Sequence, residues 1–208
     1  MRRLHFLPLS AAVLTLALSS VTVAQDEDQA LADRNKRLLE MRKGDFDYLL
    51  GDWRFTARST QWGDFGGVWS AVRLATGGGA HVLDEYRITG DQGETWFASS
   101  TLRVYNPAMD RWQLVSVHET SGLQDLGTAH KVGDEMHIEQ TFGANGRTPE
   151  LWRIRYFDIR PDAFRWAADR SLDGGKTWER DHMTLQARRT GPARSLPALA
   201  VADSTKRQ

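Results

Sequence analysis

The sequence of 208 residues contains no cysteine, and this absence removes several classes of site. Without thiols the chain forms no disulfide, holds no metal through thiolates, uses no cysteine nucleophile and carries no lipid on a cysteine. A protein without disulfides depends on its buried core for stability, and a chain of this length can bury one good core. We therefore expect a single domain held together by apolar packing.

The sequence also lacks an excess of charge of either sign, because 27 Lys and Arg residues balance 27 Asp and Glu residues. Arg2 and Arg3 are the only charged residues of the first 24, so the remaining 184 residues carry 25 basic and 27 acidic side chains. A nearly neutral surface does not attract polyanions. We expect neither nucleic acid nor an acidic membrane surface as a partner.

A long apolar run is the third absence. The run LPLSAAVLTLALSSV is short for a membrane span, follows the basic residues MRR, and leads to the small residues of VTVA and then to QDEDQ. This is the pattern of an export signal. The sequence predicts a signal peptide over residues 1–24 and a periplasmic or secreted protein with no stable membrane insertion after cleavage. An uncleaved anchor is the alternative.

Two further segments lie outside the expected domain. Residues 25–43 are charged with few apolar positions, which predicts a solvated leader or a short helix that ends at Gly44. Residues 190–208 are rich in Pro, Ala, Ser and Thr without any period, which predicts a disordered tail. Residues 44–189 remain as the folded domain.

Within that domain the polarity alternates in short segments separated by turn residues, which is typical of antiparallel strands. We expect ten strands, over residues 52–59, 67–75, 81–88, 95–105, 111–118, 126–132, 135–142, 150–159, 163–170 and 177–188. Strands joined mostly by short turns close most simply into an up-and-down barrel, because closure removes the exposed sheet edges. The predicted fold class is all-β, a single antiparallel barrel preceded by a short helix.

Two stretches, TGDQGETW over residues 89–96 and SLDGGKTW over residues 171–178, match the Asp-box hairpin of sialidase propellers. A propeller of four-stranded blades needs a far longer chain, so a sialidase is excluded. Asp91 and Asp173 are expected to accept hydrogen bonds from the amides of their own turns. Their role is structural.

Three segments carry a resemblance to a known family. LLGDW at 49–53, the YNP…RW hairpin at 105–112 and the closing SLDGGKTWE at 171–179 are together similar to an uncharacterised family of exported bacterial lipocalin-like (calycin-like) domains. The resemblance covers residues 44–189 and implies a calycin-like barrel, without lending a function. It also implies a structural pair at the barrel end, in which Trp53 packs against Arg188, or against Arg189.

The histidines raise a question of cofactor binding. His137 shares a strand face with Glu139, but no spacing typical of a metal site accompanies any histidine. The segment HMTLQARR is more distantly similar to the closing strand of nitrobindins, which implies haem binding through His182. Against this, the apolar residues Met183, Leu185 and Ala187 occupy the other strand face. If that face is inward, His182 points to solvent, and we expect no cofactor.

Eight tryptophans leave a binding function as the leading hypothesis. Core packing explains most of them, but the loop TQWGDFGGVW places Trp62, Phe65 and Trp69 where an aromatic barrel mouth would lie. We expect an exported barrel that binds a small, largely apolar ligand, with His137 and His182 as further wall residues. A haem or metal barrel acting on small reactive molecules is the alternative. A hydrolase or isomerase with a dispersed site is another, although carboxylates such as Asp84 form no catalytic pattern.

Overall fold

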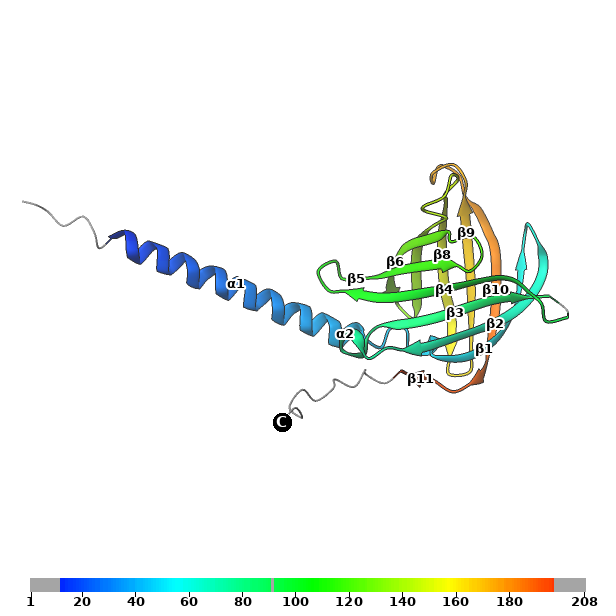
Figure 1. The fold of residues 1–208 in the computed structure, drawn as a ribbon, viewed down its shortest axis with the longest axis horizontal. Coiled ribbons are helices and arrows are strands. Elements are labelled where there is room, and N and C mark those ends of the chain that lie inside the picture. Colours follow the sequence, from blue (N-terminus) through cyan, green and yellow to red (C-terminus); the bar gives the residue numbers. More distant parts are fainter. Residues whose placement is uncertain (1–11, 91, 197–208) are drawn as a thin grey trace, which may run out of the picture.

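The computed structural model describes residues 12–90 and 92–196. In these residues ten antiparallel strands follow one another around a closed barrel, which confirms the predicted fold class (Figure 1). The strands are β1 (Gly51–Ser59), β2 (Gly63–Arg73), β3 (Val82–Thr89), β4 (Thr95–Asn106), β5 (Arg111–His118), β6 (Gln124–Val132), β7 (Glu135–Phe142), β8 (Glu150–Arg160), β9 (Ala163–Ser171) and β10 (Glu179–Gly191).

Each strand pairs with the next along the chain, and β10 pairs with β1 to close the barrel. Closure satisfies the backbone groups of both edge strands, which an open sheet would leave unpaired. Residues along each strand alternate between the interior and the surface, as in β5, where Trp112, Leu114 and Ser116 are buried between exposed neighbours. This alternation is the period of two from which the strands were predicted.

A helix, α1 (Ala12–Arg42), precedes the barrel and projects away from it (Figure 1). It is longer than the short helix that we expected, and residues 12–24 of the predicted signal peptide form its first part. Residues 1–11 lie outside the described residues, and cleavage after residue 24 stays a prediction. Among the described residues, no helix has the length and apolar character needed to cross a bilayer.

Two short elements complete the fold. The β2–β3 connection contains α2 (Thr76–Gly79), which lies at the barrel end that α1 reaches (Figure 1). In the segment expected to be a tail, β11 (Arg194–Ser195) pairs parallel with β2, and Arg194 Nη2 donates to Asp52 Oδ1 at 2.7 Å. Residues 197–208 of that segment lie outside the described residues.

One end of the barrel is closed by the segment that leads into β1. The 3₁₀ turn η1 (Asp47–Leu49) buries Leu49 there, the flanking residues Phe46 and Leu50 are also buried, and Trp53 Nε1 donates to the carbonyl of Leu49 at 2.8 Å. Gly51 has φ 111°, and a Cβ on it would lie 2.5 Å from Nη1 of Arg189. The glycine of the Gly-x-Trp pattern is therefore required by its positive φ and by the carbonyl oxygens of Gly191 and Pro192, which would lie 2.7 and 2.9 Å from that Cβ; the Arg189 guanidinium also lies close.

That arginine is Arg189, which corrects the pairing of Trp53 with Arg188. The Arg189 guanidinium lies 4.1 Å from the centroid of the Trp53 ring and donates to the carbonyls of Tyr48 and Pro161 at 3.1 and 2.6 Å. Arg188 is exposed. Leu185 and Ala187 are buried, so the period of two places residue 189 on the inner face and residue 188 outside.

The β9–β10 connection shows the expected hairpin chemistry at Asp173. Its Oδ1 accepts from the backbone N–H groups of Lys176 and Thr177 at 3.0 and 2.9 Å, and its Oδ2 accepts from the Thr177 hydroxyl at 2.7 Å. These bonds, those from Thr177 foremost, lower the pKa of Asp173 to about 2. Asp91, in the other predicted hairpin, lies outside the described residues.

Because the folded state lowers this pKa, the turn stabilises the protein above the ordinary carboxyl pKa of about 3.9 and loses that contribution as the pH falls towards 2. We expect the Asp173 carboxyl to titrate near 2 in carbon-detected NMR. The Asp173→Asn variant should show a shallower fall in unfolding free energy between about pH 4 and pH 2 than the unsubstituted protein. A carboxyl that titrates at its ordinary value would contradict this account of the turn.

Candidate functional site

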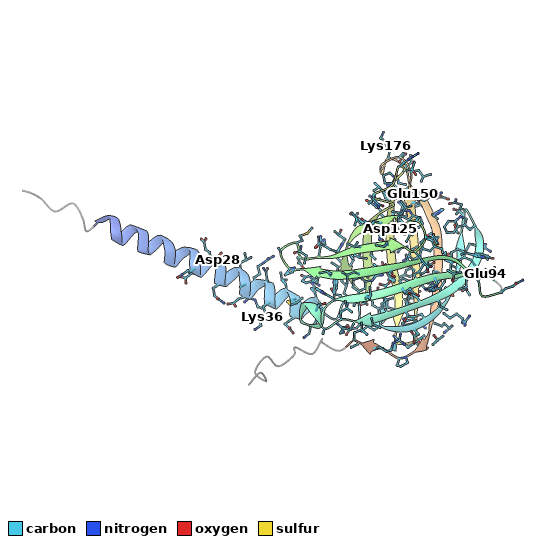
Figure 2. All side chains as sticks on the ribbon, viewed as in Figure 1. Asp28, Lys36, Glu94, Asp125, Glu150 and Lys176 are labelled. Carbon is cyan, nitrogen blue, oxygen red and sulfur yellow. The ribbon has the colours of Figure 1, made fainter. Side chains whose placement is uncertain are left out.

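The strands enclose a cavity of about 390 Å³, within the range of known small-molecule sites. Its wall is formed by inward-facing side chains of β2 to β10. Trp62, in the β1–β2 turn, also lines it and is 58% exposed, which marks that end as the mouth. Since β1 runs from the plugged end to this turn, the mouth lies opposite the plug. In Figure 2, the labelled residues Asp125 and Glu150, which line the cavity, lie towards the end of the barrel at which Lys176 marks the β9–β10 loop.

Much of the wall is aromatic. Trp69 is buried, and its ring lies 5.3 Å from that of Tyr86 and 5.9 Å from that of Tyr156. Nearer the mouth, Phe142 stacks on Trp152 with ring centroids 4.4 Å apart. Such rings offer large, rigid apolar surfaces to a ligand.

A buried ion pair interrupts this apolar surface. Arg103 Nε donates to Asp84 Oδ2 at 2.7 Å, and the two side chains are only 3% and 1% exposed. Trp69 Nε1 donates to the other carboxylate oxygen at 2.8 Å. Burial, the largest single influence, lowers the pKa of Arg103, but the charge and hydrogen bond of Asp84 together with the nearby Tyr156 and Tyr48 outweigh it, and the pKa is raised. The cavity wall therefore contains a fixed pair of opposite charges.

Hydroxyl and amide groups continue the polar part of the wall. The hydroxyls of Thr101 and Ser116 are 2.9 Å apart, and Gln140 Nε2 donates to Ser116 at 3.3 Å. Burial raises the pKa of both Tyr86 and Tyr156, so their hydroxyls keep their protons at neutral pH. These groups add hydrogen-bonding capacity to the wall without adding net charge.

Two histidines line the cavity, each beside a carboxylate. His118 Nε2 lies 2.9 Å from Asp125 Oδ2, and Asp125 also accepts from the backbone N–H of Gly143 at 2.8 Å. His182 Nδ1 lies 2.7 Å from the Thr60 hydroxyl and 3.1 Å from Glu179 Oε2.

The burial of His182 corrects the sequence-based expectation. Met183 is buried, as the apolar pattern predicts, yet the preceding residue His182 is also buried, at 1% exposure, and does not point to solvent. The register of β10 against β9 shifts between Glu179 and Met183, and Asp181 has φ 47°. This bulge breaks the alternation, so two successive side chains face inward.

The other predicted site residues divide between the mouth and the outer surface. Trp62 and Phe65 lie together at the mouth, with ring centroids 6.2 Å apart, and Trp69 lies deeper in the wall. His137 does not line the cavity. It lies on the outer face of β7 and contacts Glu135 Oε2 through Nε2 at 2.8 Å. The cavity thus brings together Trp62, Trp69 and His182, but neither Phe65 nor His137 lines it.

Sequence reasoning missed the charged part of the site. Asp84 was not distinguished from other carboxylates, and Arg103, His118 and Asp125 were not singled out. A signal for the first two was present: each stands at an inward position of its strand, two residues from buried Val82 or Tyr105. A charged residue at such a position requires a buried partner.

The described residues contain no cluster of three or more His, Asp or Glu side chains that could hold a metal ion. Comparison with known proteins adds no assignment: no family model matches the chain, and no curated protein matches it. The resemblance to lipocalin-like domains therefore stays a prediction that rests on its three motifs and agrees with the barrel fold.

Proposed function

We propose that the protein binds a small molecule inside the barrel. The observation that carries the proposal is the cavity of about 390 Å³, whose wall combines aromatic rings with a few fixed polar groups. Known small-molecule sites share this composition, in which apolar surface supplies affinity and polar groups orient the ligand. The ligand that suits the wall has a largely apolar body and one polar end.

The pairing of Asp84 favours binding over an acid–base role for this carboxylate. Asp84 is held by Arg103 and Trp69, and Asp125 by His118 and the amide of Gly143. Hydrogen bonds of this kind fix side chains in one orientation. A hydrolase or isomerase would need a protonatable group that is free to exchange a proton with its substrate, and His118, which has Asp125 on one ring nitrogen, is the group of the wall that this alternative would use. The N-terminal pattern of residues 1–24 adds the proposal that binding takes place outside the cytoplasm.

The haem alternative rests on His182, which lines the cavity with Nδ1 engaged by Thr60 and Glu179. An engaged second nitrogen is usual for a ligating imidazole. The rest of the wall fits a porphyrin poorly, because the Asp84–Arg103 pair and the hydroxyls of Thr101 and Ser116 occupy the interior that an apolar macrocycle would contact. A Soret shift on adding haem, lost in the His182→Ala variant, would favour the alternative.

Replacing a small residue of the cavity wall by a large one, which fills the cavity, tests the proposal. Ser99, on β4, lines the cavity, whereas the next residue, Ser100, is exposed on the outer surface. N-phenyl-1-naphthylamine is uncharged and fluoresces when it leaves water for an apolar site. We expect it to bind at one molecule per barrel, and the Ser99→Trp variant to bind it about tenfold more weakly or not at all, which corresponds to a loss of about 1.4 kcal/mol or more.

The Ser100→Trp variant is the matched control, since it adds the same side chain one position away on the other face of the strand. We expect it to bind the dye like the unsubstituted protein. Circular dichroism and thermal unfolding establish that both variants are folded. Equal dye binding by a folded Ser99→Trp variant would place the dye outside the barrel and would refute the proposal.

A further inference from the structure

Arg103 has hydrogen-bonding capacity that the protein itself does not use. A guanidinium carries five N–H donors. Nε of Arg103 donates to Asp84, but the buried Nη1 has no hydrogen-bond partner. An unpaired donor on a buried charged group is costly, and native proteins seldom retain one without a role.

Three groups of the protein surround the guanidinium: the Phe46 ring, the Asp84 carboxylate and the Tyr156 side chain. The group lies over the Phe46 ring, 4.9 Å from its centroid, so the side towards the plug is aromatic. Asp84 occupies the Nε edge at 2.7 Å. Arg103 also lines the cavity, so a molecule bound there lies against its side chain, although Nη1 itself is buried and a small shift of the guanidinium is needed for it to donate.

A second donor lies nearby. Tyr156 lines the same cavity, and its pKa is raised by burial, although Arg103 beside it acts in the opposite direction. A tyrosine that keeps its proton can donate to the same oxygen as the guanidinium. An oxygen placed there would meet an arginine and a phenol, while the rest of the molecule would contact Trp69 and Tyr86.

The charges of the cavity wall favour a neutral acceptor on the ligand over an ionised one. The charge of Arg103 is already compensated by Asp84. Besides its two histidines, the wall contains the acidic residues Asp84, Asp125 and Glu150 and the basic residues Arg103 and Arg170. A carboxylate ligand would add a buried negative charge with no cation in excess to balance it, which is unfavourable. A carbonyl oxygen accepts the same hydrogen bonds without that penalty.

We propose that the ligand is an uncharged molecule with an apolar, ring-sized body and a carbonyl-type oxygen, and that Arg103 binds this oxygen inside the barrel. This inference rests on the proposed function, because it names the class of molecule that the same cavity takes. It makes Arg103 the residue that selects for a ketone, ester or amide over a hydrocarbon of the same shape.

Three naphthalene derivatives of similar size test the inference on the unsubstituted protein: 2-acetylnaphthalene, 2-ethylnaphthalene and 2-naphthoate. The affinity of each compound is measured in a competition titration, from the concentration at which it displaces bound N-phenyl-1-naphthylamine. Taking a ketone out of water costs more than taking out an ethyl group, so the ketone binds more tightly only if the protein supplies a donor. We expect the ketone to bind about tenfold more tightly than the ethyl compound, since bonds to charged groups are the strong ones. The carboxylate should bind more weakly than the ketone.

Infrared spectroscopy gives a second readout, since donation from Arg103 shifts the carbonyl stretch of the bound ketone below its value in a dry apolar solvent. In an Asp84→Leu/Arg103→Met double variant the preference for the ketone over the ethyl compound should disappear. Tighter binding of the ethyl compound to the unsubstituted protein would overturn the inference and leave the proposed function standing. The carboxylate binding most tightly would also overturn it, in favour of an anionic ligand. Failure of the dye and of all three compounds to bind would overturn the proposed function itself.

Discussion

The Asp84→Ala variant is expected to lose about 3–5 kcal/mol of unfolding free energy, the usual cost of removing one partner of a buried ion pair. The substitution leaves the guanidinium of Arg103, only 3% exposed, without its carboxylate. It also removes the acceptor of Trp69 Nε1. Urea denaturation followed by tryptophan fluorescence measures the loss.

Two variants separate the charge effect from other consequences. Glu85→Ala removes the neighbouring carboxylate, which faces outward at 48% exposure, and should change stability far less. The Asp84→Leu/Arg103→Met double variant replaces both charges by apolar side chains and should recover most of the lost stability, because no buried charge is left unpaired. A double variant as unstable as Asp84→Ala would show that the cost comes from lost packing.

The Arg189→Ala variant is expected to lose about 2–4 kcal/mol, because bonds from a charged group and the stacking on Trp53 disappear together. Arg189 links the segment before β1 to the turn between β8 and β9. It donates to the carbonyls of Tyr48 and Leu50 in the first and to the carbonyl of Pro161 in the second. Without it, these carbonyls lose their partner and the Trp53 ring loses its cover.

Arg188→Ala is the control for this prediction, since Arg188 is the exposed neighbour on the same strand. We expect its unfolding free energy to stay within about 0.5 kcal/mol of the unsubstituted protein, as for most surface changes. If the two alanine variants were equally destabilised, the assignment of the stacked arginine to position 189 would be wrong.

The architecture could be predicted from the sequence because its cause is local. Each strand repeats inward and outward residues with a period of two, and each turn contains residues that tolerate turn geometry, as at Asp173. The position of the stacked arginine was also within reach of this argument. The resemblance implies Arg188 or Arg189, and the period of two, counted from buried Leu185, selects Arg189.

The site was less predictable because it depends on register and on a local irregularity. Asp84 and Arg103 are diagonal neighbours, since Asp84 pairs with Thr101 and Arg103 with Val82, and no local pattern fixes that register. His182 faces inward because of the bulge at Asp181. The backbone of Asp181 is left-handed, and the presence of an aspartate in the sequence does not by itself predict that conformation. The cavity is formed by side chains from nine strands and is not visible in any one segment.

The central claim is that the barrel interior holds a small molecule. Native mass spectrometry of the protein purified from the cells that make it tests the claim most directly, with the Ser99→Trp and Ser100→Trp variants in parallel. We predict one additional small mass on the unsubstituted protein and on Ser100→Trp, released on denaturation, and none on Ser99→Trp. Equal retention of that mass by a folded Ser99→Trp variant, or its absence from all three proteins together with a failure to bind the dye, would contradict the account.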